Sequence, residues 1–336
     1  MKIIKELTSL NLEKVKEKIE SDDLVIFPTE TVYGIGANAL SSKAVSKIFA
    51  VKERARNNPL IVHIKDKSEI EKYAVIENEI EQKLIDTFMP GPFTLILKKK
   101  DRIPGVVTAG MDTVGIRIPI NKFAHQFLEY VKYPIAAPSA NISTRPSGTN
   151  LEDIKVEFEG LIDLAIDGGK SKIGLESTVV KVIDNVPTIL RPGFITKEDI
   201  ESIGLPCQIS KYVLEQLQND SKVESPGMLY RHYAPNTKCL LVYSENINTL
   251  QELVKKNLTK KTILLGSEKL KDIPSYKYIC YGNTKEEICH NIFSLLRKCD
   301  EYEADLIIIE GVEKVGLGLA IMNRLLRTSN FNYQEQ

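Results

Sequence analysis

One stretch near the N-terminus, residues 24–36, restricts the fold of this chain more than any other. Residues 24–27 are all apolar, which is typical of a short buried strand. Pro28 ends this strand, because proline has no N–H to donate to a sheet. Hydroxyl residues, Glu30 and two glycines follow. Such an ending leaves hydrogen-bonding groups at the edge of a sheet, where ligands bind in α/β folds, although the same residues also suit an ordinary turn.

Similar polar segments, punctuated by glycine or proline, follow or end apolar runs farther along the chain. They are residues 52–59, 90–94, 114–119, 137–149, 167–180 and 190–193. Loops of one domain can converge on a single cleft, so we expect these segments to meet there.

The periodicity of apolar residues differs between the two parts of the chain. The first part mixes helical and strand patterns without regular alternation, which predicts an α/β domain with a twisted mixed sheet. Its expected helices are 9–20, 42–54, 78–88, 121–131 and 151–158, and its expected strands are 24–27, 60–64, 93–97, 114–118, 135–137, 164–166, 177–182 and 188–190. The last part alternates strands with helices, which predicts a smaller, Rossmann-like parallel sheet. Those strands are 239–242, 262–265, 278–281 and 305–310, and those helices are 247–257, 285–299 and 316–327.

We therefore divide the chain into a first domain (1–205), a linker strap (206–237) and a C-terminal domain (238–336). The strap contains methionine, tyrosines, arginine and histidine rather than the Ser, Gly and Glu of a loose linker. It could therefore pack over a site in the first domain or serve as a tether.

The charge and cysteine content exclude several classes of protein. The chain has 336 residues with 45 Lys+Arg and 45 Asp+Glu, so no overall field attracts nucleic acid or membrane. A basic site must therefore be local. Five scattered cysteines without a CxxC pair predict free thiols in a reducing cytoplasm, and the histidine spacing predicts no metal ligands. No run approaches 18 apolar residues, so we expect no membrane span.

Four basic residues are candidates for binding an anion. Lys52 and Arg54 lie at the end of a predicted helix, where they could also simply complement the helix dipole. Arg117 lies inside an apolar strand, where an arginine is costly unless it is paired. It could pair with an acidic side chain or with a ligand carboxylate. Arg191 ends another apolar strand, and the planar guanidinium suits carboxylate and phosphate oxygens.

The remaining motifs favour binding and electrostatics over a covalent nucleophile. The hydroxyl-rich segment 138–149 could be capped turns or could donate to a phosphate or sugar. A P-loop is excluded, because Leu164 stands where glycine would be required before Gly169. His63 lies between apolar residues of a strand, where packing is the more ordinary role.

Taken together, the motifs resemble the YrdC-like family, in the order that this family has them. The resemblance rests on residues 27–34, 52–54, 59–60, 90–97, 115–119, 137–143, 167–169, 174–180 and 190–193. Residues 226–228, 232–235, 318–320 and 323–325 resemble the long, two-domain form of the family. Three positions depart from the family pattern, namely Met89, Thr144 and Gly148.

The resemblance implies a nucleotidyltransferase, L-threonylcarbamoyladenylate synthase. It joins L-threonine, bicarbonate or CO2 and ATP, releases pyrophosphate and supplies the intermediate for t6A at position 37 of tRNA. The resemblance also implies site residues. Lys52 and Arg54 would be catalytic; Thr31, His63, Arg117, Ala137 and Ser177 would bind threonine; Arg54, Asn58, Thr113, Ser139, Ser147, Arg191 and Arg231 would bind ATP.

The resemblance further implies Mg²⁺, which would arrive with ATP, and a downstream tRNA threonylcarbamoyl transferase machinery as partner, with no direct tRNA contact required. The alternative is a non-catalytic double-stranded RNA-binding module, which the zero net charge disfavours. A carbamoyl-adenylating enzyme of hydrogenase maturation is another relative, but the acylphosphatase and zinc-finger segments of that enzyme are not in this sequence.

Overall fold

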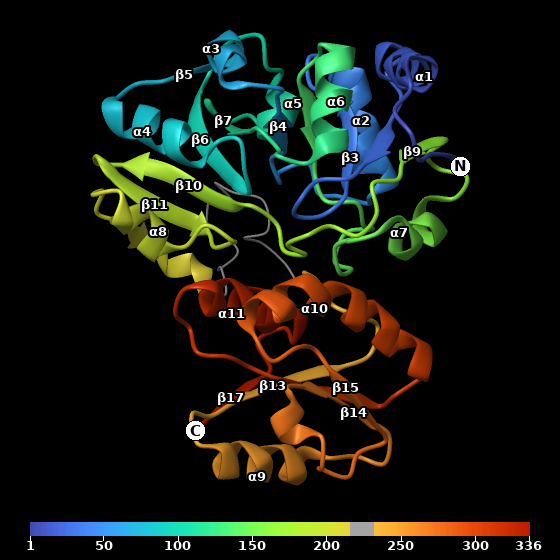
Figure 1. The fold of residues 1–336 in the computed structure, drawn as a ribbon, viewed down its shortest axis with the longest axis vertical. Helices are drawn as coiled ribbons and strands as arrows, with labels where there is room; N and C mark the ends of the chain where they lie inside the picture. Colours follow the sequence, from blue (N-terminus) through green and yellow to red (C-terminus); the bar gives the residue numbers. More distant parts are fainter. Residues whose placement is uncertain (216–231) are drawn as a thin grey trace.

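The computed structural model describes residues 1–215 and 232–336 and contains two α/β domains (Figure 1). The strands of the first domain are β1 (Lys2–Ile4), β2 (Val25–Phe27), β3 (Gly34–Asn38), β4 (Ile61–His63), β5 (Ala74–Val75), β6 (Phe93–Lys99), β7 (Thr113–Arg117), β8 (Ile135–Ala137), β9 (Leu164–Ile166), β10 (Thr178–Ile183), β11 (Val186–Arg191) and β12 (Gln208–Ile209). Its helices are α1 (Ser9–Glu20), α2 (Ser42–Val51), α3 (Ile70–Tyr73), α4 (Glu79–Phe88), α5 (Gly105–Thr108), α6 (Lys122–Val131), α7 (Leu151–Phe158) and α8 (Lys197–Ser202).

The first sheet is mixed, as the sequence predicts. Its strand order is β1-β9-β2-β3-β8-β4-β7-β6-β10-β11-β12, with β5 beside β6. It contains parallel pairs, such as β4 with β7, and antiparallel pairs, such as β6 with β7. This order places the expected site strands β8, β4, β7 and β6 side by side in the middle of the sheet.

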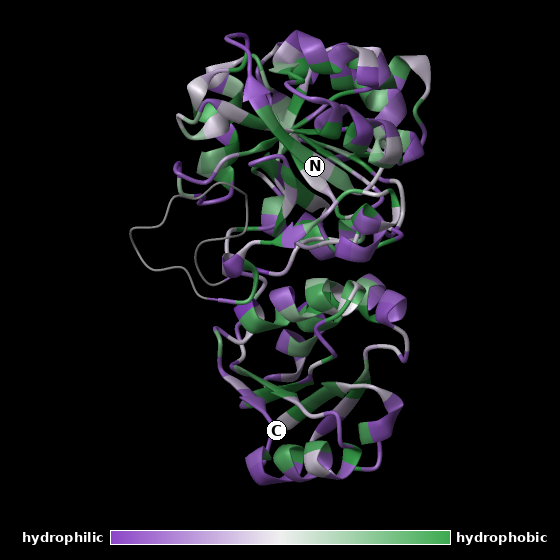
Figure 2. Cartoon of the chain, turned by 90° about the vertical axis from the view of Figure 1, so that its left-hand side faces the viewer, coloured by the Kyte–Doolittle hydropathy of each residue, from purple (hydrophilic) through white to green (hydrophobic). Residues whose placement is uncertain are grey.

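Two apolar clusters cover opposite faces of this sheet. Val25 and Phe27 belong to a cluster with α1 and α6, whereas Ile26 between them belongs to a larger cluster with α2, α4 and α7. This alternation follows from the two-residue period of a strand. The buried strands are hydrophobic, and hydrophilic residues lie mainly on the outer surface (Figure 2).

The C-terminal domain is a parallel sheet, also as predicted. Its order is β15-β14-β16-β13-β17, and every recorded pairing is parallel. The strands are β13 (Cys239–Tyr243), β14 (Thr262–Gly266), β15 (Lys277–Cys280), β16 (Leu306–Glu310) and β17 (Tyr333–Glu335), and the α-helices are α9 (Ile247–Asn257), α10 (Lys285–Cys299) and α11 (Leu317–Thr328). In Figure 1, α10 and α11 lie between this sheet and the first domain, whereas α9 covers the far face.

Most predicted elements are confirmed, and the differences are short or glycine-containing elements. β3 was expected to be a loop, because it begins with Gly34-Ile35-Gly36. Glycine is needed there: a Cβ on Gly36 would lie 2.8 Å from Ile135 and 2.9 Å from Phe27. The predicted helix 42–54 ends at Val51, so Lys52 is its C-cap and Arg54 lies beyond it. The sequence analysis did not predict β1, β5, β12, β17 and the short helices α3, α5 and α8.

No helix in the two described ranges combines the length and the apolar character that are needed to cross a bilayer. All five cysteines lie in these ranges, and none of them forms a disulfide.

Candidate active site

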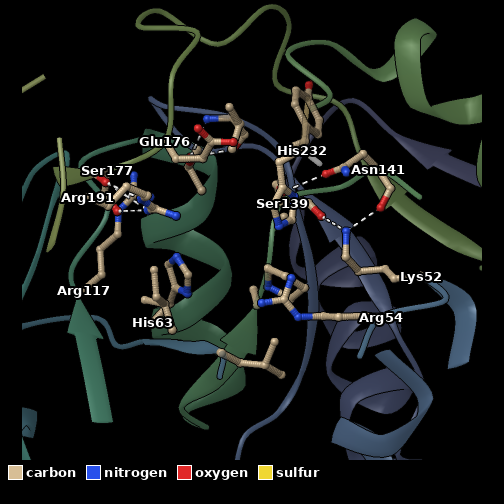
Figure 3. A pocket seen from close by; sticks show the side chains of 18 of the residues that line it. Lys52, Arg54, His63, Arg117, Ser139, Asn141, Glu176, Ser177, Arg191 and His232 are labelled. Carbon is tan, nitrogen blue, oxygen red and sulfur yellow. Dashed lines mark hydrogen bonds between the residues drawn. The ribbon is translucent and has the colours of Figure 1, made fainter. Parts of the chain in front are cut away.

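A cavity of about 720 Å³, including its open mouth, lies on the α1/α6 face of the first sheet. Its floor contains Ile61, His63, Arg117 and Ala137 from three neighbouring strands. The other lining residues are Thr29, Val32, Tyr33, Gly34, Lys52, Arg54, Pro59, Leu60, Pro138, Ser139, Asn141, Ser143, Glu176, Ser177, Arg191, His232 and Tyr233. Of the polar segments singled out in the sequence, 52–59, 114–119, 137–149, 167–180 and 190–193 therefore converge on the cavity, whereas no residue of 90–94 is among the lining residues (Figure 3).

Arg117 is held in place by an acidic residue of the first polar loop. Its Nη2 donates to Oε1 of Glu30 at 2.5 Å, and both side chains are only 5% exposed. The other oxygen of Glu30 accepts the backbone N–H of Ile120 at 3.2 Å. Of the two partners considered for Arg117, the acidic side chain is thus present. Nε of Arg117 is buried and has no protein partner, so the guanidinium keeps a donor that the fold does not use.

His63 lies beside Arg117 on the adjacent strand, as its Cα partner in the β4–β7 pair. Burial, reinforced by the charge of Arg117, lowers the pKa of His63 to about 3. Its ring meets Phe27 edge-on at a centroid distance of 5.8 Å, and its Nδ1 has no partner. His63 is therefore a neutral imidazole at the cavity floor.

Lys52 holds the hydroxyl-rich segment 138–149 through hydrogen bonds. Its Nζ donates to the backbone oxygens of Ser139 and Asn141, and the hydroxyl of Ser139 donates to Oδ1 of Asn141 at 2.6 Å. Figure 3 shows these bonds on one side of the cavity. Burial and the nearby charge of Arg54 lower the pKa of Lys52 well below its ordinary value. The ammonium is thus costly to keep charged here, and an anionic ligand would offset that cost.

Arg54 enters the cavity from the turn after α2. Glu53, between it and Lys52, has a left-handed backbone with φ of 52°, which reverses the chain. The guanidinium donates to the backbone oxygens of Asn58 at 3.4 Å and Pro59 at 3.0 Å. Burial lowers the pKa of Arg54 to about 10, so it remains a cation at neutral pH.

Arg191 and Ser177 form the opposite wall. Arg191 donates through Nε and Nη2 to the backbone oxygen of Ser177, at 3.1 and 2.9 Å, and through Nη2 to its hydroxyl at 3.1 Å. That hydroxyl also shares a 2.8 Å hydrogen bond with Thr94. Gly193 permits this close approach, because a Cβ there would lie 2.4 Å from the backbone N of Thr178. Burial lowers the pKa of Arg191 to about 10.

The described residues resume at His232, and both His232 and Tyr233 line the cavity. Tyr233 stacks on Phe293 of α10 with ring centroids 5.1 Å apart, and its backbone oxygen accepts the hydroxyl of Thr328 in α11 at 3.1 Å. Burial and the charge of Arg54 lower the pKa of His232 to about 3. The C-terminal domain thus supports one side of the cavity.

The structure brings together most of the site residues predicted from the resemblance. Those that line the cavity are Lys52, Arg54, His63, Arg117, Ala137, Ser139, Ser177 and Arg191. Four others are not among its lining residues. Thr31 is buried against Thr29, Asn58 lies behind Arg54, Thr113 lines a smaller neighbouring cavity and Ser147 binds Glu176. Arg231 lies outside the described residues, as do 216–230 of the predicted strap.

The sequence analysis assigned no site role to Asn141, Glu176 or Tyr233, all of which line the cavity. Glu176 precedes Ser177 in a segment of small and apolar residues, and a carboxylate in such a context was the available signal. The lining contains hydroxyl groups together with four basic side chains, those of Lys52, Arg54, Arg117 and Arg191. This arrangement suits a ligand that carries both a carboxylate and phosphate groups.

Comparisons with known proteins agree with this site. The model of the Sua5/YciO/YrdC family, described as telomere recombination, matches residues 17–193. The model of the threonylcarbamoyl-AMP synthase C-terminal domain matches residues 195–329. Threonylcarbamoyl-AMP synthase of Pyrococcus abyssi is 42% identical over 318 residues, which cover 93% of this chain and 92% of the relative.

A second enzyme of that name, from Bacillus subtilis, is 40% identical and covers 93% of this chain and 90% of its own length. The crystal structure of P. abyssi Sua5 complexed with L-threonine superposes with a TM-score of 0.94 at 37% identity and covers 100% of both chains. These relatives and the two family models confirm the resemblance seen in the sequence: the chain belongs to the threonylcarbamoyl-AMP synthase family, in its two-domain form.

Proposed function

We propose that this chain makes threonylcarbamoyl-AMP and pyrophosphate from L-threonine, bicarbonate or CO2 and ATP, in the cavity described above. The observation that carries the proposal is the meeting of Arg117, Lys52, Arg54 and Arg191 in one cavity of about 720 Å³. An amino acid needs one guanidinium for its carboxylate, and a triphosphate needs several cations for its oxygens. Both requirements are met within one enclosure.

Threonine would bind on the sheet floor. The open edge of Arg117 would receive its carboxylate, while Glu30 holds the other edge of the guanidinium at 2.5 Å. Ser177, His63 and Ala137 lie around that position on the cavity lining. Neutral His63 adds no charge that would repel the amino group of threonine. Thr31 is fully buried behind Thr29 and would act through this neighbour.

ATP would bind between Lys52, Arg54, Ser139 and Arg191. The phosphates would replace the backbone oxygens that now accept from Lys52 and Arg54. Asn58, Thr113 and Ser147 would support this side from outside the present lining, and Arg231 lies beyond the described residues. Lys52 and Arg54 would stabilise the negative charge that develops as pyrophosphate leaves.

The reaction that we propose is mainly one of positioning. The threonine nitrogen bonds to the carbon of CO2 and loses a proton to solvent, which gives a carbamate. A carbamate oxygen then attacks the α-phosphorus, a new P–O bond forms, and the bond to the bridging oxygen breaks as pyrophosphate leaves. The enclosing walls would hold the two reactants in contact and exclude water from the labile product.

Mg²⁺ fits this site only as a companion of ATP. Among the described residues, no group of three His, Cys, Asp or Glu side chains gathers to hold a metal. Glu176 is the carboxylate of the lining, and both of its oxygens already accept hydrogen bonds, from Ser147 and Arg324. Phosphate oxygens and water, the ligands that Mg²⁺ ordinarily keeps in such sites, would therefore hold the ion and neutralise phosphate charge.

A double-stranded RNA-binding module is the competing function. Such a module needs exposed cations that reach backbone phosphates. Here three of the four basic side chains of the cavity are almost completely buried: Lys52 is 1% exposed, Arg117 4% and Arg191 7%. A duplex could not reach them, which favours a small-molecule substrate.

The test is pyrophosphate release by the purified chain, with mass spectrometry of the nucleotide product. We expect release only when ATP, L-threonine and bicarbonate are all present, and a product with the mass of threonylcarbamoyl-AMP. Pyrophosphate release without threonine would overturn the proposal. The product would feed t6A formation by a downstream tRNA threonylcarbamoyl transferase machinery. We also propose that the chain works in the cytoplasm without requiring tRNA, a placement that its disulfide-free cysteines support.

A further inference from the structure

The acidic residue of the cavity lining, Glu176, connects the two domains. It is 5% exposed and lies between β9 and β10, directly before Ser177. Its Oε1 accepts the hydroxyl of Ser147 at 2.5 Å, and its Oε2 accepts Nε of Arg324 at 2.9 Å. Ser147 belongs to the first domain, whereas Arg324 belongs to helix α11 of the C-terminal domain. One carboxylate therefore joins a site loop of the first domain to the second domain.

Arg324 is itself fixed in position. Its side chain is fully buried, and its Nη1 donates to Oδ1 of Asn323 at 2.6 Å. Its guanidinium carbon lies 5.5 Å from the ring centroid of Tyr233, a second residue of the cavity lining. Arg324 thus contacts two residues of the cavity wall without lining the cavity.

The charges around Glu176 keep its carboxylate ionised and paired with the guanidinium of Arg324. Burial alone would raise the pKa of Glu176, but the charges of Arg324 and Arg191 outweigh burial and lower it. Glu176 is therefore a carboxylate at neutral pH. A buried carboxylate without its cation is strongly unfavourable, so the docking of α11 stabilises the loop at 176–177 in this position.

We propose that Arg324 is a positioning residue of the active site: by holding Glu176, the C-terminal domain fixes Ser177 in the lining of the cavity and Ser147 against Glu176. The geometry continues from Glu176 to its neighbour Ser177, whose hydroxyl meets Thr94 and Arg191 at 2.8 and 3.1 Å. A shift of the 176–177 loop would displace all of these groups. This inference rests on the proposed function and assigns the C-terminal domain a part in it.

A second arginine across the same interface provides a matched control. Arg297 of α10 donates to Glu157 at 2.7 Å and to the backbone oxygen of Asp153 at 2.8 Å, and it also donates to the backbone oxygen of Pro146. None of these three partners is among the lining residues of the cavity. Arg297 therefore reports what docking contributes without the contact to Glu176, although one of its partners, Pro146, directly precedes Ser147.

The first experiment compares kcat and KM for threonine-dependent pyrophosphate release, together with thermal midpoints, in Arg324→Met, Arg324→Lys and Arg297→Ala. We expect Arg324→Met to lower kcat/KM for threonine by about tenfold or more, since small misplacements of binding groups have effects of this size. Arg324→Lys keeps the charge but loses the fork, and should recover part of the activity. Arg297→Ala should lower the thermal midpoint while kcat/KM stays within about twofold.

The second experiment removes both charges, in Glu176→Gln with Arg324→Met, so that no buried carboxylate is left unpaired. If Arg324 positions the loop, this variant regains thermal stability but its kcat/KM stays low. Recovery of kcat/KM in the double variant, or an equal loss in Arg297→Ala, would show that Arg324 is only a structural bridge. Failure of the proposed function would look different, because the unmodified chain would then release no pyrophosphate with threonine.

Discussion

The two sheets of this molecule treat buried polar groups differently. In the C-terminal sheet, Glu310 ends β16 at the edge where ligands bind in many parallel folds. Its carboxylate is already satisfied, since Oε2 accepts the N–H of Ser267 at 2.6 Å and Oε1 accepts its hydroxyl at 3.1 Å. In the first sheet, Arg117 and His63 are equally buried, but Nε of Arg117 and Nδ1 of His63 have no protein partner.

This difference indicates where a ligand belongs. Buried polar atoms are nearly always hydrogen-bonded, so an open donor on a buried strand calls for an explanation. The C-terminal sheet follows the topology that often binds nucleotides, yet its carboxylate at the strand ends is already bonded within the protein. The mixed sheet has the less suggestive topology, but its unpartnered buried atoms belong to Arg117 and His63, which line the cavity, whereas Tyr278 and Tyr333 of the C-terminal sheet, whose hydroxyls are also buried without a partner, do not line it. Unpartnered polar atoms on the residues of a cavity lining, rather than strand order, thus mark the active site here.

The strongest test of this comparison is Arg117→Ala. We expect threonine affinity to fall by about 100-fold or more, because a bidentate charge-assisted contact is lost, while binding of a non-hydrolysable ATP analogue changes little. Titration calorimetry with each ligand separately measures both quantities. Unchanged threonine affinity would contradict the role given to the open guanidinium edge.

Arg117→Ala also leaves Glu30 buried without its cation, which by itself costs about 3–5 kcal/mol of folding free energy. The matched control is therefore Glu30→Gln with Arg117→Ala, in which no unpaired charge is left. If that double variant regains stability and still fails to bind threonine, the loss belongs to the missing guanidinium and not to unfolding.

Glu30→Gln alone sharpens the same point with a smaller effect. A neutral amide can still accept from Arg117, but the bond is weaker and the fork less firmly oriented. We expect KM for threonine to rise about tenfold with kcat nearly unchanged, because the defect lies in binding. Steady-state kinetics at saturating ATP measure this. A fall in kcat with constant KM would instead implicate Glu30 in the chemical step.

The same contrast explains how much of the structure could be predicted. In the C-terminal domain the bounds of α9 and α10 match the prediction, because the N-caps Asn246 and Thr284 mark where these long helices begin and basic residues occupy their last turns. In the first domain β3 was missed, since its glycines suggest a loop when the sequence is considered locally. They are required by Phe27 and Ile135, which only the folded sheet brings together.

The candidate site shows a similar limit. Arg117 could be singled out because a cation in an apolar strand is conspicuous, and the strand order then places His63 beside it. Its partner Glu30 could not be assigned, because 87 residues separate the two in sequence. Arg324 appeared in a family motif, but its contact with Glu176 depends on how two domains dock, and no local pattern encodes that.

Glu310→Ala tests the C-terminal sheet, where the carboxylate at the strand end is already hydrogen-bonded within the protein. It removes the acceptor for two groups of Ser267 in the C-terminal sheet, so we expect a loss of about 1–3 kcal/mol in the free energy of unfolding. Because that carboxylate serves the fold and not the ligand, KM for threonine should be unchanged. Denaturant melts and kinetics on one preparation give both values. A large rise in KM with normal stability would place a function at the second sheet.

The smallest expected effect concerns pH and His63. Its pKa is about 3 in the folded chain, because of burial and Arg117, against 6.5 for an ordinary histidine. Below pH 6.5 His63 therefore binds a proton in the unfolded chain but stays neutral in the folded chain. The free energy of unfolding consequently falls as the pH drops toward 3. Between pH 7 and pH 5 we expect His63 to contribute a loss of about 1–2 kcal/mol.

Hydrogen exchange can locate this loss, because it follows each domain separately. At pH 5, protection should decrease in β4, β7 and β8 around His63 more than in β13, β14 and β16 of the C-terminal sheet, after correction for the intrinsic pH dependence of exchange. In His63→Asn the difference between the two sheets should shrink, since asparagine does not titrate in this range. An equal loss of protection in both sheets would mean that the acid-sensitive groups are not concentrated at the site, and the contrast between the sheets would then rest on hydrogen bonding alone.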